Sequence, residues 1–507
     1  MSEPRVYEPT AASTAAPSPA LSKRGASAGA LIRTYPWAVG AVALLVVSTG
    51  LVLWTGTRPG YDPYGWLVWG HLTVHLNLDT NGAPSWKPLG FLFTVPYALV
   101  GHYALWLWMI TSVAISLSGV VFAWRIAYRL TAAAPERRYA AYAAGAFAAA
   151  ALLGIANYMH FIFSAQSDTM IVSMCLAAID CQLSGRLRWA FWLWVLGSLG
   201  RPEVWPFLGL YSVWAWWKLP SMRRWILAGL ALIPLLWFGI PALTAKTANI
   251  AGSNALHSPR ELHGNKITGT LQRFFDLQQV VVQLAALLAA ALAAFRRDRV
   301  TLMLAAGTVT WVVVEVAFAL HGFPAVPRYL FEPAGVACVL AGVFLGRVIL
   351  DLPPLIARVR ARLTPAIGRP ITPPVAGWAT GLLVLVLVGA MVPAARSSVR
   401  IERKDLTHER ARTKQINRLS TVVKRLGGGS RILACGQPNM PIAYQSVLAW
   451  YMGVKIGELY FSRNYERLHP HPLVNFVPHS NGWQVFPSHV NAASAGRCRG
   501  LRLTLTS

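Results

Sequence analysis

Apolar runs of about 20 residues recur along this chain, separated by short segments that carry Arg and Lys. A helix of that length spans about 30 Å, which is the thickness of the hydrocarbon core of a bilayer. Because a helix pairs its own backbone groups, it is the expected spanning element in lipid. The pattern therefore predicts an all-α polytopic membrane protein with about ten or eleven transmembrane helices.

One of the apolar stretches, 189–217, is interrupted by Arg201-Pro202-Glu203. We interpret it as two short or kinked helices whose turn lies on the outer side of the membrane. The predicted helices cover 36–54, 102–124, 139–156, 169–185, the two parts of 189–217, 225–244, a segment ending before Arg296, 300–320, a segment between Tyr329 and Arg347, and 374–392.

Composition agrees with this pattern, since 55% of the 507 residues are hydrophobic and only 13% are charged. The net charge of +27 could indicate nucleic-acid binding, but most Arg and Lys residues lie in short loops between apolar runs. That placement is typical of the positive-inside rule, and no basic-aromatic module is visible, so we predict no nucleic-acid partner. The rule places the N-terminus in the cytoplasm and the segments 55–101 and 394–507 outside.

The two ends of the chain differ from the membrane domain, which we predict over 34–393 with an outer segment at 55–101. Residues 1–33 are rich in Ala, Ser and Pro, which indicates a disordered cytoplasmic tail. The first apolar run is long enough to remain as an anchor, so we do not expect a cleaved signal peptide.

The C-terminal segment, 394–507, predicts a small extracytoplasmic α/β domain. Apolar residues of 401–426 share one helical face, and three glycines from Gly427 end that helix. We expect a strand at 431–436, a helix at 441–452 and a second strand at 454–459. Cys435 and Cys498 are the only cysteines in this exported segment, so a disulfide between them is expected.

The outer segment after the first predicted helix contains two charged residues of interest, Asp62 and Lys87. Asp62 follows the helix by only about seven residues, so it stays close to the bilayer. Lys87 lies in Pro84-Ser85-Trp86-Lys87-Pro88-Leu89. The segment is either a connector lying on the membrane or a part of a polar cavity. Ionisable groups at membrane depth are costly and usually functional, which favours the cavity.

Three more charged sites fall on the predicted outer side, and each has a purely structural alternative. Asp168 could cap a helix N-terminus. Arg201 and Glu203 could neutralise each other at a kink, and Arg328 with Tyr329 could anchor a helix at the interface. Together with Lys87 and Asp62, they suit an anionic lipid-linked substrate and an acceptor hydroxyl.

These short motifs resemble those of the GT-C superfamily, which comprises polytopic glycosyltransferases that use polyprenyl-phosphate sugars. The likeness includes actinobacterial mannosyl- and arabinofuranosyltransferases, and it covers most of the membrane domain as a layout. It implies that Asp62 is the catalytic residue and that Lys87 meets the lipid phosphate. Leu89 replaces the second proline of the family's Lys-Pro-Pro stretch, and Asp62 stands alone where many members have two adjacent acids. We therefore predict no cofactor, and a divalent metal remains an alternative that a single acid does not support.

The expected activity is inverting transfer of a sugar from polyprenyl phosphate to a cell-envelope glycan, lipid or protein in the plasma membrane. The residues expected to bind substrate are Lys87, Arg201, Glu203, Arg328, Tyr329, Asp79 and Asp168. A lipid or glycan transporter and a non-catalytic scaffold remain as alternatives, although no internal repeat supports a transporter. In the exported domain, the aromatic side chains could stack on sugars or pack a core, namely Tyr444, Trp450, Tyr460 and Trp483.

Overall fold

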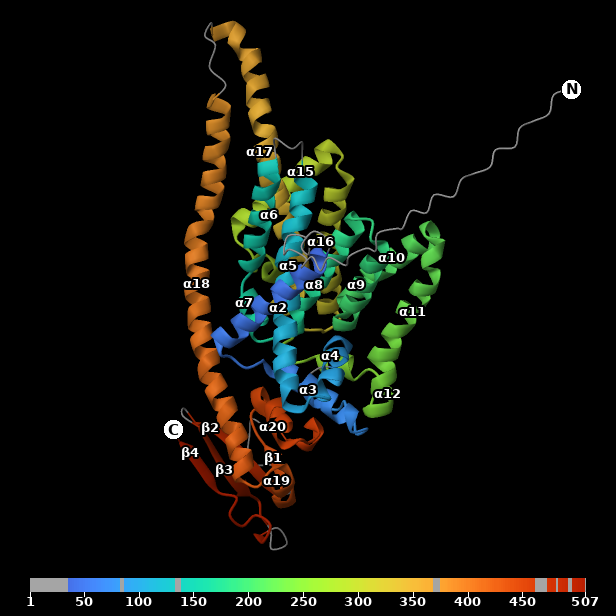
Figure 1. The fold of residues 1–507 in the computed structure, drawn as a ribbon, viewed down its shortest axis with the longest axis vertical. Helices are drawn as coiled ribbons and strands as arrows, with labels where there is room; N and C mark the ends of the chain where they lie inside the picture. The colour runs from blue at the N-terminus through green and yellow to red at the C-terminus, as the bar shows by residue number, and fades with distance from the viewer. Residues whose placement is uncertain are drawn as a thin grey trace, which may run out of the picture. The chain divides into compact units, whose positions relative to one another are not determined.

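The structure is a computed structural model that describes residues 35–82, 86–132, 138–367, 374–460, 472–479, 482–490 and 495–506. The predicted cytoplasmic tail, 1–33, lies outside the described residues, as do Pro84 and Ser85. The chain divides into two units, Met1–Ala43 and Leu44–Ser507. Helix α2 (Pro36–Thr55) begins in the first unit and ends in the second. The descriptions below concern the second unit (Figure 1).

Helices form where the apolar runs predict them. The longer ones are α5 (Ala104–Thr131), α6 (Arg138–Leu153), α8 (Ser167–Leu183), α9 (Leu187–Gly200), α10 (Trp205–Lys218), α11 (Arg223–Pro234), α15 (Val280–Arg296), α16 (Arg299–Leu320), α17 (Phe331–Ile367) and α18 (Pro374–Arg425). The shorter ones are α3 (Tyr61–Val74), α4 (Pro88–Ala98), α7 (Tyr158–Phe163), α12 (Ile240–Thr244), α13 (Ile250–Ala255) and α14 (Lys266–Phe275).

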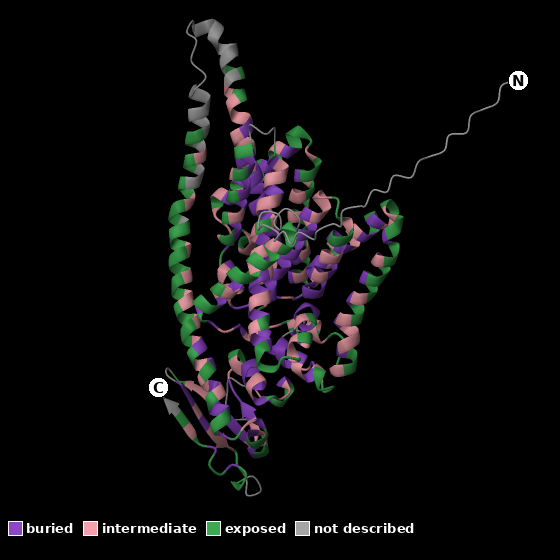
Figure 2. Ribbon diagram, in the orientation of Figure 1, coloured by how far each residue is buried: buried purple, intermediate pink, exposed green. Residues whose placement is uncertain are grey.

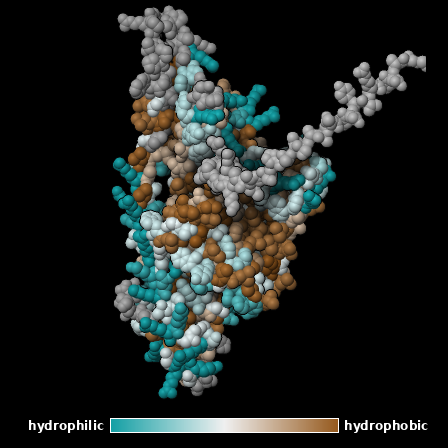
Figure 3. All heavy atoms as spheres, viewed as in Figure 1, coloured by the Kyte–Doolittle hydropathy of each residue, from teal (hydrophilic) through white to brown (hydrophobic). Residues whose placement is uncertain are grey.

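The chain is a multi-pass membrane protein. Among the described residues, six helices are long and apolar enough to cross a bilayer, or seven if α14 and α15, bent by 102°, form one span. This number is lower than the predicted ten or eleven because several predicted spans are short helices. For example, α6, α8 and α9 contain 16, 17 and 14 residues. Figure 3 shows hydrophobic side chains gathered over the helices of the membrane domain, with hydrophilic ones along the C-terminal half of α18.

The centre of the membrane domain is closely packed. Helices α5 and α17 contact each other and both α6 and α8, and the four helices carry many of the buried residues (Figure 2). A Cβ added to Gly342 of α17 would lie 2.4 Å from the carbonyl oxygen of Ala144 in α6. Glycine is therefore required there, as is usual where membrane helices approach closely.

Arginines from the predicted cytoplasmic loops lie together at one end of this bundle. Arg125 and Arg129 of α5 lie 3.2 and 3.4 Å from the carboxylate of Asp180 near the end of α8. Arg347 of α17 lies 3.8 Å from Asp298, which caps α16. Figure 1 shows that the carboxyl end of α17 and the C-terminal sheet lie at opposite ends of the unit. This arrangement is the one that the Arg-rich loops predict, while the side that faces the cytoplasm stays a prediction.

The described part of the predicted outer segment, 55–82 and 86–101, is packed and is not a simple connector. Helices α3 and α4 lie against each other, and α3 also packs against the C-terminal α20 (Gln445–Met452). A Cβ on Gly90 would lie 2.5 Å from the ring of Trp66, and one on Gly70 would lie 2.5 Å from the carbonyl oxygen of Thr94. The two glycines therefore allow α3 and α4 to approach closely, which holds both Asp62 and Lys87 in place.

Helix α18 runs without interruption from Pro374 to Arg425. The sequence predicts two elements there, 374–392 and 401–426, and the structure joins them. The predicted glycine stop is confirmed, because Gly427 and Gly428 have φ angles of 90° and 85° that end the helix.

The C-terminal domain is a small sheet with short helices, but two predicted strands are wrong. Residues 431–436 belong mostly to α19 (Gly429–Cys435), and 454–459 contains a short 3-10 turn, Ile456–Glu458. A short apolar run does not distinguish a strand from a helix by its periodicity, which explains both errors. The predicted helix at 441–452 is present as a 3-10 turn followed by α20.

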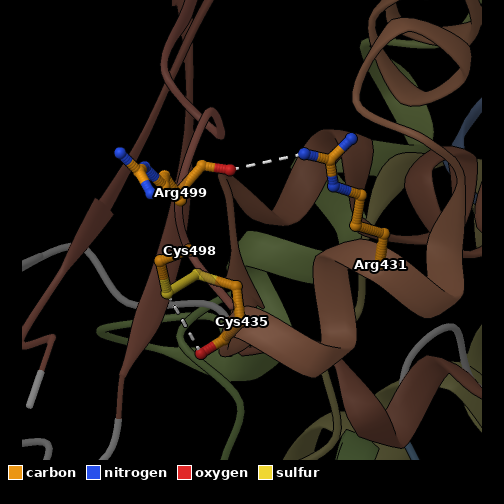
Figure 4. The surroundings of a disulfide bond; sticks show 4 residues. All are labelled: Arg431, Cys435, Cys498 and Arg499. Carbon is orange, nitrogen blue, oxygen red and sulfur yellow. Dashed lines mark hydrogen bonds between the residues drawn. A yellow bond between two sulfur atoms is a disulfide. The ribbon is translucent and has the colours of Figure 1, made fainter. Parts of the chain in front are cut away.

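The sheet comprises β1 (Gln437–Asn439), β2 (Leu473–His479), β3 (Gly482–Ser488) and β4 (Leu503–Thr506) in that order. β1 is parallel to β2, and the other two pairings are antiparallel. A disulfide joins Cys435 and Cys498, whose Cα atoms are 4.7 Å apart (Figure 4). Beside it, Arg431 donates a hydrogen bond to the carbonyl of Arg499. The cross-link closes a separation of 63 residues, which stabilises a folded domain by about 4 kcal/mol in the chain-entropy model.

Candidate functional site

Arg201 is the centre of a buried cluster of charged side chains. Because Pro202 follows it, its backbone leaves the helical region and is extended, with φ −152° and ψ 135°, and α9 ends at Gly200. The guanidinium is 2% exposed and contacts the carboxylate of Asp168 directly. It also lies 3.9 Å from Glu203 and 3.7 Å from Glu332, the second residue of α17. Three acids thus surround one buried cation.

Asp168 does not cap its helix, so that structural alternative is wrong. The N-cap of α8 is Gln166, and no side-chain capping hydrogen bond is formed there. The carboxylate of Asp168 is fully buried between two guanidinium groups, those of Arg201 and Arg328. Its second oxygen, Oδ2, has no hydrogen-bond partner among the described residues. Asp168 therefore links the helix break at Arg201 to Arg328.

Arg328 connects this buried cluster with Asp62. It lies in a 3-10 turn, Pro327–Leu330, that leads into α17. Its Nη1 is 3.8 Å from Oδ2 of Asp62, and its Nε is 3.8 Å from Oδ1 of Asp168. Asp62 lies in the first turn of α3. The side chains of Asp62 and Arg328 are 18% and 17% exposed, so both remain reachable from outside the protein.

Lys87 forms the N-cap of α4 and points to the start of α8. Its Nζ lies 3.4 Å from the hydroxyl oxygen of Ser167 and 5.9 Å from the ring centroid of Trp66. Burial lowers the pKa of the Lys87 ammonium from its usual value, and the carboxylate of Asp168 acts in the opposite direction. Within the described residues, the Nζ of Lys87 forms no ion pair, and its single hydrogen bond is this long one to a hydroxyl. The Lys87 ammonium thus has N–H donors that no described residue accepts from.

A cavity of about 280 Å³ lies beside these residues. Lys87, Arg201, Glu203 and Tyr329 form its charged and polar side, and the ring of Tyr329 lies 4.2 Å from the guanidinium of Arg201. The rest of the wall is mostly apolar and includes Trp86, Trp205, Trp237, Phe238, Phe318 and Phe323. Among the described residues, those that line the cavity do not include Asp62, Asp168 or Arg328. The arrangement offers an apolar chamber whose charged groups include both cations and acids.

Glu315 of α16 also lines the cavity, and the sequence interpretation missed it. It is 1% exposed, and its Oε2 has no hydrogen-bond partner among the described residues. A signal was present, since Glu315 is the only acid within the apolar run 300–320, and an acid inside a span usually has a function. Glu332, which contacts Arg201, was likewise assigned no function.

Asp79 lies apart from the cluster, although it was expected to bind substrate. Its Oδ1 accepts hydrogen bonds of 2.8 Å from the backbone and side-chain amides of Asn81. It therefore stabilises a turn. The structure brings together the other six residues expected to bind substrate with Asp62: Lys87, Asp168, Arg201, Glu203, Arg328 and Tyr329.

The aromatic residues of the C-terminal domain differ in their surroundings. Trp483 is fully buried, and its indole N–H donates to the carbonyl of Gln415. Tyr444 packs edge-on against it at 5.0 Å. These two therefore pack a core, as one of the two alternatives predicts, whereas Trp450 and Tyr460 are half-buried.

No protein-family model matches the chain, and no curated protein matches it. Among solved structures, it is similar to ArnT from Cupriavidus metallidurans in the apo state, with 13% identity and a TM-score of 0.50 over 86% of this chain and 87% of that one. ArnT bound to undecaprenyl phosphate is similar with 14% identity and a TM-score of 0.47 over 85% and 87%.

The fold is a GT-C fold. At 13% identity, the likeness to the apo structure shows the fold alone, so the chemistry has to be argued from the residues of this chain. The fold class is thus the one that the sequence predicts: a polytopic helical membrane protein with a small C-terminal α/β part.

Proposed function

We propose that this chain is a membrane glycosyltransferase that transfers a sugar from a polyprenyl-phosphate donor to a cell-envelope glycan, lipid or protein acceptor. The site faces the extracytoplasmic side of the plasma membrane, with the N-terminus in the cytoplasm. The donor sugar is a hexose such as mannose or a pentose such as arabinofuranose. The acceptor hydroxyl displaces the phosphate in one step, which inverts the anomeric carbon.

The observation that carries this proposal is the convergence of three cations and an accessible acid beside an apolar cavity. Lys87 and Arg201 line the cavity, and Arg328 lies between Asp62 and Asp168. A polyprenyl-phosphate sugar has an apolar chain, an anionic phosphate and a neutral sugar. The cavity offers an apolar wall for the chain, and Lys87 in that wall, with Arg328 near it, offers cations for the phosphate. The fold shared with ArnT agrees with this assignment, and one solved structure of ArnT holds undecaprenyl phosphate.

The cations differ in their freedom to bind a phosphate. Arg201 is already surrounded by Asp168, Glu203 and Glu332, so its charge is compensated within the protein. Lys87 has a single long contact to a hydroxyl, and the two ion pairs of Arg328 are both long, at 3.8 Å. We therefore assign the phosphate to Lys87 and Arg328, and we assign to Arg201 the positioning of Asp168 and Tyr329.

In the proposed reaction, Asp62 accepts the proton of the acceptor hydroxyl as its oxygen attacks the anomeric carbon. The new bond joins that oxygen to the carbon, and the bond from the carbon to the phosphate oxygen breaks. The electron pair of the broken bond stays on the phosphate, which is already a stable anion and needs no general acid. Lys87 and Arg328 stabilise the charge that builds on the phosphate as it leaves.

The proposed function is tested with the purified full-length protein in detergent and radiolabelled polyprenyl-phosphate mannose or arabinose. Envelope glycan and lipid extracts serve as acceptors. We expect one donor to yield a labelled product together with free polyprenyl phosphate in equal amounts. Movement of the intact donor across vesicle membranes without a labelled product would contradict the proposal and favour the transporter alternative.

Replacing Lys87 by alanine is expected to weaken use of the donor. The phosphate loses one charge-assisted hydrogen bond, worth about 1.5–3 kcal/mol, so KM for the donor should rise about ten- to a hundredfold. The measurement is donor-dependent transfer at a fixed acceptor concentration. Lys246→Ala is the matched control, because Lys246 is exposed and outside the cluster. An unchanged KM in Lys87→Ala would contradict the assignment of Lys87 to the phosphate.

A further inference from the structure

A second group of polar side chains lies outside the proposed transferase site, where α7 meets α18. It consists of His160 from α7 and of Asp405 and Glu409 from α18. The Nδ1 atom of His160 lies 2.8 Å from Oδ2 of Asp405. One ligand atom of each residue lies within 4.8 Å of the other two, and all three side chains are half-buried. We call these three residues the α7–α18 cluster.

Acids gather on one face of α18 near α7. Asp405 and Glu409 are four residues apart, so their carboxylates lie on one helical face and repel each other. Glu402 adds a third acid to the same face, three residues before Asp405. One cation, Arg412, lies 3.2 Å from Oε2 of Glu409, which leaves the other oxygen of that carboxylate available. His160 is the residue that the neighbouring helix places opposite this face.

The geometry of the cluster is close to that of a metal site. Two ligands that each lie about 2.1 Å from one tetrahedral Zn²⁺ are separated by about 3.4 Å. The ligand atoms here lie within 4.8 Å of one another, so rotations of half-buried side chains close the remaining distance. One imidazole nitrogen with two carboxylates is a ligand set that suits Zn²⁺ or Mn²⁺, whereas Mg²⁺ and Ca²⁺ prefer oxygen ligands throughout.

We propose that His160, Asp405 and Glu409 bind one divalent transition-metal ion, with Zn²⁺ preferred and water as the fourth ligand. This site is separate from the transferase chemistry and does not depend on it. It ties α18, which carries the C-terminal domain, to α7 of the membrane domain.

The contacts around the α7–α18 cluster indicate which elements a bound metal would hold in place. Near the cluster, α18 binds the stretch that leads to Asp62, since Arg410 and Arg412 donate to the carbonyls of Thr55 and Pro59. On the other side, the ring of Phe161 in α7 lies 5.8 Å from the guanidinium of Arg328. The metal would thus join the two elements that flank the Asp62–Arg328 pair, and its function is positional.

The test uses the full-length protein in detergent, stripped with EDTA and then equilibrated with ZnCl₂, MnCl₂ or MgCl₂. Metal content is measured by mass spectrometry, and thermal unfolding is followed with and without each salt. We expect about one Zn²⁺ per chain, in line with a single site, and a higher unfolding midpoint with ZnCl₂ than with MgCl₂. His160→Ala and the conservative Glu409→Gln should both lose the ion and the shift. The loss of affinity should exceed the about 10- to 100-fold that removal of an outer-shell partner causes.

His257→Ala is the matched control, because His257 lies 3.2 Å from Glu261 but belongs to no three-ligand group among the described residues. It should retain Zn²⁺ like the unaltered protein. Equal Zn²⁺ content in the unaltered protein and in both cluster variants would overturn the proposal. An equal response to MgCl₂ and ZnCl₂ would overturn the assignment to a transition metal. Because neither measurement uses sugar transfer, the result is independent of the proposed function.

Discussion

Asp62→Asn should abolish sugar transfer, with kcat falling by at least about 100-fold, because a positioned general base contributes about 10²- to 10⁴-fold. The substitution keeps the size of the side chain and removes its ability to accept a proton from a hydroxyl. Asp62 lies 3.8 Å from Arg328 and is partly exposed, so loss of this ion pair should change the free energy of unfolding little. The measurement is initial transfer rate under saturating donor, together with binding of polyprenyl phosphate.

Asp79→Asn is the control for this experiment. Asp79 is in the same outer segment, but its carboxylate holds a turn by accepting from Asn81, away from the cations. Transfer should therefore persist. If Asp79→Asn is inactive and Asp62→Asn is active, the catalytic assignment is reversed. If both variants transfer sugar at the unaltered rate, the base does not come from this segment, and the proposed mechanism fails.

Arg201→Met should destabilise the protein by about 3–5 kcal/mol, the typical effect of removing one partner of a buried ion pair. Methionine fills much of the volume of arginine but leaves the carboxylates of Asp168, Glu203 and Glu332 without their shared cation. The apparent free energy of unfolding in detergent can be measured by denaturant titration. Arg223→Met is the control, because Arg223 is exposed and its guanidinium stacks on Trp216 at the surface. Its effect should stay within about 0.5 kcal/mol.

A second substitution separates the ion-pair network from simple packing. Adding Asp168→Asn to Arg201→Met removes one of the uncompensated charges, so part of the lost stability should return. A double variant as unstable as the sum of the two single ones would show that Asp168 and Arg201 act independently. That outcome would refute the network described around Arg201.

Much of the membrane domain could be predicted because few backbone structures are stable in a bilayer. An apolar run of spanning length has to become a helix, and Arg-rich loops mark its ends. The helix break at Arg201 was also predictable, since a proline with two charged neighbours does not continue an apolar helix. The candidate site followed from one property shared by weak motifs: Asp62, Lys87 and Arg328 all fall on the predicted outer side of the membrane.

The parts that were not predicted depend on contacts between distant segments. Nothing near Arg201 in the sequence indicates that Glu332, from another helix, completes its shell of acids. The strands β2 and β3 form a hairpin whose β1 neighbour lies more than thirty residues earlier, in register Gln437 with Leu473. Local apolar runs predicted strands at 431–436 and 454–459, but these segments pack as helical turns because the sheet is completed by later segments.

Because α18 is one uninterrupted helix, the number of residues in it sets the direction in which the C-terminal domain faces around the helix axis. Its 52 residues extend about 78 Å at 1.5 Å per residue, more than twice the thickness of the hydrocarbon core. Thr413 and Asn417 on this helix accept hydrogen bonds from the backbone and side chain of Arg58. One inserted residue before them would turn that face by about 100°, whereas seven or eleven would nearly restore it. Relatives of this protein can therefore change the distance between membrane and domain only in steps close to whole turns.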